Sequence, residues 1–128
     1  MYPKDYRYTK EHEWIKADGA TGTIGITDYA QHELGDVVFV ELPKVGTQLK
    51  AGQSLGTIES VKAVSDVYAP VTGEVIAAND KLADDLELLS QDPFGEGWIA
   101  RIKIADEAGL KKLMDFAAYQ KQIAEESH

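Results

Sequence analysis

The sequence contains no cysteine among its 128 residues. This absence excludes disulfides, thiolate metal sites and cysteine nucleophiles, so any thiol chemistry must come from a group attached to the chain. Long apolar runs are also missing, because no window approaches the roughly 18 apolar residues that a membrane-spanning helix needs. Residues 1–5 have the features of neither a signal peptide nor an Arg-rich transit sequence. We therefore expect a cytoplasmic protein without a membrane partner.

Positive charge is scarce as well. The chain has 13 Lys and Arg against 22 Asp and Glu, which gives a formal net charge of −9. Nucleic-acid binding requires clustered basic residues, so it is excluded, and positively charged faces of other proteins are the expected partners. A chain that is 44% hydrophobic and 27% charged predicts one globular domain over residues 1–128, with its core at about 8–104. We expect no exposed apolar stripe beyond the core faces, which favours a monomer.

Short strands separated by turn residues dominate the pattern. Residues 15–19 and 21–26 are typical of strands joined by a turn, and residues 37–42 of a strand closed by Pro43. Further turn residues divide the chain as far as Ile76: Gly46, Gly52, Gly56, Pro70 and Gly73. Turns at this density predict a mainly β barrel or sandwich.

Two helices are expected. Residues 27–35 predict about two turns, with Thr27 as the N-cap and Gly35 as the stop. After a strand over 98–104, apolar residues at helical spacing predict a second helix over about 106–123, and its first residue is an aspartate that can cap it. This helix is expected to pack on the barrel.

A weak internal repeat is also present. Gly46–Leu55 can be laid over Asn79–Leu88, with leucines matching at an offset of 33 positions. This match predicts two copies of one hairpin unit that pair into a quasi-symmetric flattened barrel. Glu59–Ala63 would then lie at the connection between the two halves.

Common catalytic motifs are absent, including the zinc-protease helix, the nucleophile elbow, the phosphate loop and the dinucleotide fingerprint. His12–Lys16 opens like a zinc motif but lacks the second histidine, so we expect surface histidines and no metal site. The acidic run Asp84–Glu87 is typical of a solvated turn. Asp92–Trp98 is either a structural turn with buried aromatics or a docking surface.

Lys62 stands between two β-branched stretches in the segment 56–70, with polar residues around it. This pattern predicts a strand, a tight turn and a second strand, with the lysine at the tip. An exposed lysine amine is a poor nucleophile at neutral pH and is better suited to be modified than to catalyse. From the residues alone, an ordinary solvated charge is the simpler interpretation.

Several longer motifs give the chain a family resemblance. They occur in the family's order over nearly the whole chain: Tyr8–Trp14, Gly25–Gln31, Leu34–Pro43, Glu59–Ala63 and Asp92–Trp98. In these motifs the sequence closely resembles the H proteins of the glycine cleavage system, which belong to the lipoyl and biotinyl carrier group. The resemblance implies a barrel-sandwich hybrid of lipoyl-domain type, with two quasi-symmetric antiparallel sheets, a short internal helix and a C-terminal helix.

The same resemblance implies a function. In the family, the lysine that matches Lys62 carries lipoate in amide linkage, attached by a lipoate ligase or a lipoyl/octanoyl transferase. The swinging arm receives an aminomethyl group from the pyridoxal-phosphate glycine decarboxylase (P protein) and carries it to the folate-dependent aminomethyltransferase (T protein). Dihydrolipoamide dehydrogenase (L protein) reoxidises the arm. Residues 1–128 would then form one lipoyl-carrier domain that is not an enzyme.

Four further site residues follow from the resemblance. Glu13 and Asp66 match positions that line a cleft sheltering the loaded arm, and Glu33 matches a cleft position that some relatives fill with histidine. Glu59 matches the acidic residue that lipoyl-attaching enzymes favour near the target lysine, although it is equally typical of a charged strand end.

Other functions remain open at this point. A relative with the same fold can act as a lipoyl relay that donates lipoate to oxoacid dehydrogenase complexes. A biotin carrier is disfavoured, because biotin acceptors of this fold usually have methionines beside the lysine, whereas Val61 and Ala63 stand here. An unmodified interaction module would leave Lys62 inert. An enzyme would need a nucleophile and a base within reach, and no such set is visible.

Overall fold

The structure is a computed structural model, and it describes residues 5–126. The strands are β1 (Arg7–Tyr8), β2 (Glu13–Asp18), β3 (Thr21–Ile26), β4 (Val37–Glu41), β5 (Gln48–Leu49), β6 (Ser54–Ser60), β7 (Val64–Tyr68), β8 (Gly73–Ala78) and β9 (Ala100–Ile104). The helices are α1 (Asp28–Leu34), α2 (Lys81–Asp84), α3 (Leu88–Gln91), α4 (Glu107–Lys111) and α5 (Phe116–Glu126). None of the described helices combines the length and the apolar content needed to cross a bilayer.

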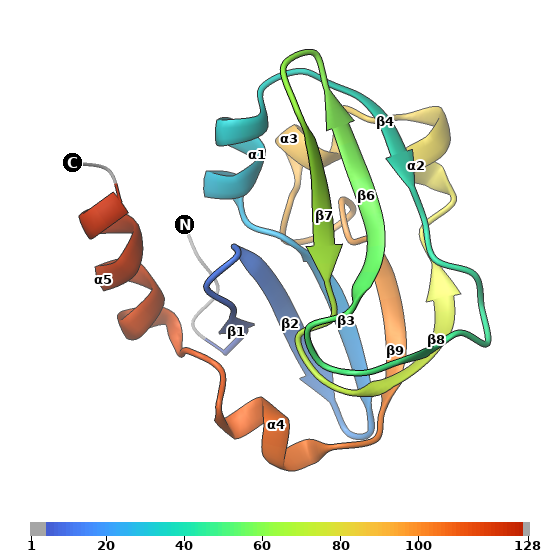
Figure 1. Cartoon of the computed structure of the whole chain (residues 1–128), viewed down its shortest axis with the longest axis vertical. Helices are drawn as coiled ribbons and strands as arrows, with labels where there is room; N and C mark the ends of the chain where they lie inside the picture. Colours follow the sequence, from blue (N-terminus) through green and yellow to red (C-terminus); the bar gives the residue numbers. More distant parts are fainter. Residues whose placement is uncertain (1–4, 127–128) are drawn as a thin grey trace.

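The strands form two antiparallel sheets (Figure 1). One has six strands in the order β1-β2-β3-β9-β8-β5, and the other has three in the order β4-β6-β7. Alternate residues of the strands point into one shared apolar core, which includes Ile15, Ile24, Val40, Ile58, Val75 and Ile102. The mainly β fold with two antiparallel sheets is confirmed.

Helix α1 forms where the sequence predicts it. The Thr27 side chain accepts a hydrogen bond from the N–H of Ala30 at 3.2 Å, which satisfies one of the free donors at the helix start. The helix ends at Gly35, whose φ of 76° is a conformation that glycine adopts without strain. Because the helix is only seven residues long, these caps set its ends.

The prediction that the internal repeat forms two copies of one hairpin is wrong. Its first copy contains strand β5 and the start of β6, whereas residues 79–88 fold into α2 and the start of α3. Leu82 and Leu89 of these short helices are fully buried, so this segment fills the core with helical turns in place of a second hairpin. The connection between β6 and β7 is therefore the tip of one hairpin of the smaller sheet.

The single helix expected over about 106–123 is divided into α4 and α5. Met114 lies between them and pairs with Tyr8 of β1, because the N–H of Tyr8 donates to the carbonyl of Met114 at 2.8 Å and the N–H of Met114 donates to the carbonyl of Tyr8 at 3.0 Å. These extended contacts are incompatible with helical geometry at Met114. The Asp115 side chain then accepts a hydrogen bond from the N–H of Ala118 and begins α5.

The Asp92–Trp98 segment packs as a structural turn. The indole N–H of Trp14 donates to the carbonyl of Pro93 at 2.9 Å, and the Tyr6 hydroxyl donates to the carbonyl of Phe94 at 3.0 Å. The Phe94 ring lies 6.2 Å from the Trp14 ring, within an aromatic cluster separate from the main core. These contacts support the structural interpretation of this motif.

Candidate functional site

The predicted hairpin around Lys62 is present. Strands β6 and β7 pair through Ile58 with Ser65 and Glu59 with Val64. Residues 61–63 connect the two strands, and the turn is closed by the backbone N–H of Ser60, which donates to the carbonyl of Ala63 at 2.8 Å. The side chain of Lys62 is exposed. Figure 1 shows the turn at the end of the β6–β7 hairpin, next to α1.

The side chain of Ser60 forms hydrogen bonds with the backbone of this turn. Its hydroxyl accepts hydrogen bonds from the N–H groups of Lys62 at 3.3 Å and Ala63 at 3.1 Å, and it donates to the carbonyl of Ala63 at 3.2 Å. Only 6% of Ser60 is exposed, so these bonds form away from solvent. One buried hydroxyl therefore fixes the backbone on which the lysine stands.

The turn is also attached to the end of α1. The N–H of Val61 donates to the carbonyl of Asp36 at 3.0 Å. The aliphatic stem of Lys62 lies over Gly35, where a Cβ atom would be 3.6 Å from the lysine Cε. The aliphatic part of the lysine side chain therefore lies against the C-terminal end of α1.

A pocket of about 160 Å³ opens beside this helix end. Four parts of the chain line it, namely the 11–13 segment, the end of β3, α1 and the β6–β7 hairpin. The lining residues are Glu11, His12, Glu13, Ile26, Ala30, Glu33, Leu34, Ile58, Ser65, Asp66 and Val67. The structure thus brings the three cleft residues expected from the resemblance, Glu13, Glu33 and Asp66, to one pocket with mixed apolar and acidic walls.

Glu13 is the buried acid of this pocket, with only 1% of the residue exposed. Its Oε1 accepts a 2.6 Å hydrogen bond from the Thr9 hydroxyl, and its Oε2 accepts a 3.1 Å bond from the N–H of Tyr68. Burial raises the pKa of Glu13 to about 7, although both hydrogen bonds favour the charged form. The carboxyl group can therefore gain or lose a proton near neutral pH.

The other two acids are at the solvent side of the pocket. Glu33 is exposed in the last turn of α1. Asp66 is also exposed, and its Oδ1 accepts a 3.1 Å hydrogen bond from the Ser54 hydroxyl. Glu59 does not line the pocket, because it pairs with Phe39 and Val64 and is exposed on the smaller sheet.

Some apolar side chains are exposed near Lys62. Four apolar side chains around the lysine-bearing turn have exposed fractions between 50% and 71%: Val38, Phe39, Val61 and Val64. Phe39 and Val64 are neighbours of Glu59 on either side of β6. Exposed apolar side chains that cluster in this way are typical of a surface that contacts other molecules.

Sequence reasoning missed the role of His12, which it placed on the surface. The His12 side chain is only 16% exposed, its Nδ1 lies 2.7 Å from the Tyr119 hydroxyl, and its Nε2 lies 3.1 Å from a carboxylate oxygen of Glu126. Tyr119 is 107 positions away, so no local pattern signals this contact. Within residues 5–126, no three His, Asp or Glu side chains gather in a way that would hold a metal ion.

The fold, with an exposed lysine on a hairpin tip beside an acidic pocket, agrees with the lipoyl-domain-like carrier proteins that the resemblance implies. The sequence model described as "Glycine cleavage H-protein" matches residues 6–126. The chain belongs to this family.

Individual relatives agree. The chain is 51% identical to the glycine cleavage system H protein of Carboxydothermus hydrogenoformans over 126 residues, which cover 98% of this chain and 97% of the relative. It is 54% identical to that of Chlorobium limicola over 125 residues, covering 96% and 98%. The crystal structure of a glycine cleavage system H protein from Mycobacterium marinum is similar, with a TM-score of 0.87, 38% identity and coverage of 96% and 99%.

Proposed function

We propose that this chain is the lipoyl-carrying H protein of a glycine cleavage system and that Lys62 is its attachment site. The observation that carries the proposal is the exposed lysine amine on a turn fixed by Ser60, in a chain that belongs to the H-protein family. Members of this family are carriers of lipoate, not catalysts. The chain accordingly presents its cargo to other enzymes and catalyses no step itself.

The residues around Lys62 suit covalent attachment. An amide forms between the lysine Nζ and the carboxyl group of lipoate, so the amine must reach into the active site of a lipoate ligase or a lipoyl/octanoyl transferase. An exposed side chain on a two-stranded tip offers that access, and the Ser60 and Asp36 hydrogen bonds keep the tip in one conformation. Exposed Glu59 and the neighbouring apolar side chains offer contacts for such an enzyme.

The bound group would supply the sulfur chemistry that a chain without cysteine lacks. Held in amide linkage by Lys62, that group would bring the ring disulfide needed to take up an aminomethyl group released from glycine. The absence of protein thiols means that no cysteine of this chain competes in thiol–disulfide exchange with that ring. Tethering keeps the carried group at about millimolar effective concentration for each docked enzyme.

The pocket beside α1 suits the loaded end of the arm. Its apolar residues Ile26, Ile58 and Val67 can pack against an alkyl chain, and its acidic residues can accept hydrogen bonds from an amine. Glu13 is buried there, whereas Glu33 and Asp66 are exposed. We assign these three residues to the sheltering of the carried aminomethyl group from water.

The proposed partners are those of the glycine cleavage system. They are the pyridoxal-phosphate glycine decarboxylase, the aminomethyltransferase, dihydrolipoamide dehydrogenase and the enzyme that attaches lipoate. The negative net charge of the chain favours partners with basic docking faces. A monomer in the cytoplasm remains our prediction.

Reconstitution tests the proposal. Lipoylated protein is mixed with a glycine decarboxylase of this system and labelled glycine, and release of labelled CO2 is measured. The proposal predicts release that depends on the lipoylated chain and is absent with the unmodified chain. Lipoylated protein that supports no release with an active decarboxylase, but donates lipoate to an oxoacid dehydrogenase, would replace the proposal with the relay function.

A further inference from the structure

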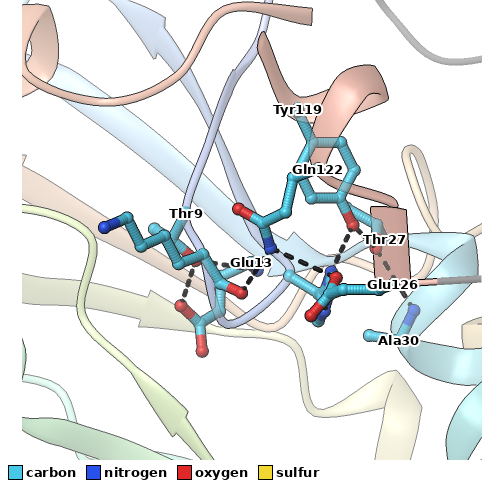
Figure 2. A network of polar contacts seen from close by, with 9 residues as sticks. Thr9, Glu13, Thr27, Ala30, Tyr119, Gln122 and Glu126 are labelled. Atoms are coloured by element: carbon cyan, nitrogen blue, oxygen red, sulfur yellow. Dashed lines mark hydrogen bonds and ion pairs between the residues drawn. The ribbon is translucent and has the colours of Figure 1, made fainter. Parts of the chain in front are cut away.

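Tyr119 connects two of the walls of the acidic pocket from outside the pocket. The 11–13 segment forms one of these two walls, and α1 forms the other. The Tyr119 hydroxyl lies 2.7 Å from His12 Nδ1 in the first wall and 2.7 Å from Thr27 Oγ1 at the start of the second. Tyr119 belongs to α5, which contributes no lining residue to the pocket. Figure 2 shows the tyrosine reaching from α5 toward Thr27.

Thr27 links the Tyr119 hydroxyl to α1. It is fully buried and caps the helix through the N–H of Ala30. Its own backbone N–H donates to the carbonyl of His12 at 2.9 Å. A hydroxyl group that fixes the Thr27 side chain therefore also fixes the start of the helix on which Ala30 and Glu33 line the pocket.

His12 links Tyr119 to Glu13, because holding His12 also holds the backbone of the next residue. The His12 φ of 73° is positive, and among the described residues other than glycine no second positive φ occurs. Such a conformation is unfavourable for histidine unless its surroundings hold it. Here α5 contacts both ring nitrogens, through Tyr119 and Glu126, and the ring packs 4.7 Å from the Tyr29 ring of α1. The next residue in the chain is Glu13, the buried acid of the pocket.

We propose that Tyr119 is a positioning residue for this pocket, whose hydroxyl group holds the His12–Glu13 segment and α1 in the arrangement that receives the carried group. The proposal rests on the proposed function. It concerns the hydroxyl and not the ring, because the ring is stacked on Tyr8 at 4.8 Å and would keep that packing without the oxygen. The C-terminal helix thus acts on the site without touching its cargo.

The test is Tyr119→Phe, with Tyr6→Phe as the matched control. The control removes a hydroxyl of the same aromatic cluster that bonds to the carbonyl of Phe94, away from the pocket. In unmodified protein, amide hydrogen exchange should become about tenfold faster at Thr27 and Ala30 in Tyr119→Phe. Exchange at Ile102 of β9 should stay unchanged, and the control should leave all three amides unaffected.

The second readout uses lipoylated protein loaded from glycine. Tyr119→Phe should shorten the lifetime of the carried aminomethyl group several-fold, while the rate of lipoylation of Lys62 stays at the wild-type level. His12→Asn removes the other end of the bond, and asparagine tolerates the positive φ, so it should act in the same direction.

The outcomes separate the two proposals. The positioning role would be overturned if Tyr119→Phe and His12→Asn both kept the wild-type exchange rates at Thr27 and Ala30. It would also be overturned if Tyr6→Phe accelerated exchange at these amides as much as Tyr119→Phe does. A lifetime that does not change despite faster exchange would also overturn it. Wild-type protein that never becomes lipoylated would overturn the proposed function, whereas the exchange experiment would still decide whether Tyr119 fixes the pocket walls.

Discussion

Glu13 accepts a 3.1 Å hydrogen bond from the backbone N–H of Tyr68, 55 positions further along the chain. Glu13 begins β2 in the six-stranded sheet, and Tyr68 ends β7 in the three-stranded sheet. One buried carboxyl group thus connects the two sheets, at the strand that follows Lys62. Its protonation should therefore affect both the stability of the fold and the pocket.

The stability of the protein should depend on pH through Glu13. Burial raises its pKa from 4.5 to about 7, so in this range the folded state keeps a proton that the unfolded state has lost. The contribution of Glu13 to the free energy of unfolding is fully present below about pH 4.5. It falls as the pH rises to about 7, with a slope approaching about 1.4 kcal/mol per pH unit. Urea unfolding at a series of pH values measures it.

Glu13→Gln is the matched variant for this experiment. Its amide can donate to the Thr9 hydroxyl and accept from the N–H of Tyr68, so both contacts persist without a titrating group. The difference in unfolding free energy between the two proteins should change across this pH range. Parallel profiles would show that Glu13 has an ordinary pKa.

Ser60→Ala should loosen the turn that presents Lys62. The variant loses a buried hydroxyl that accepts two backbone N–H bonds, and we expect a loss of about 1 kcal/mol in unfolding free energy together with slower lipoylation. Urea unfolding and the initial rate of ligase modification measure these effects. Ser90→Ala is the control, because Ser90 is exposed and bonds only to its own helical turn. Unchanged modification of Ser60→Ala would mean that the turn needs no such fixation.

Glu59→Gln should slow the attachment of lipoate without affecting the fold. Glu59 is exposed beside the lysine-bearing turn, so its neutralisation should change stability by less than about 0.5 kcal/mol. Glu41→Gln, on the neighbouring strand β4 and farther from the turn, is the control. Steady-state kinetics of the ligase distinguish the two variants. Equal rates for wild type and both variants would assign Glu59 to an ordinary charged strand end.

Gly25→Ala should destabilise the protein through Trp14. The two residues face each other across β2 and β3, and a Cβ atom on Gly25 would lie 2.6 Å from the indole ring. The ring cannot move freely, because its N–H donates to the carbonyls of Ile26 and Pro93. We expect a loss of about 1–3 kcal/mol, measured by thermal unfolding. Wild-type stability would show that the indole ring can shift.

The sequence predicted those parts of the structure that depend on neighbouring residues. Thr27 and Gly35 delimit α1 as expected, since caps act within one turn, and β-branched stretches on both sides of Lys62 form the hairpin. The break before α5 was not predictable, because it depends on the pairing of Met114 with Tyr8, far away in the chain.

The pocket was predicted only through family resemblance. Periodicity and composition give no sign that Glu13 and Asp66 line the same pocket, because the contact between the two sheets decides this. The contact of His12 with Tyr119 was missed for the same reason. Local patterns cannot report contacts between residues so far apart in sequence.

The central claim is that Lys62 carries the lipoyl group. Its most direct test is intact mass spectrometry with peptide mapping, on protein incubated with lipoate, ATP and an active lipoate ligase, beside Lys62→Arg and a biotin ligase control. We predict one lipoyl adduct on Lys62, none on the variant and none from biotin ligase. Wild-type protein without an adduct, or with an adduct on another lysine, would contradict the account.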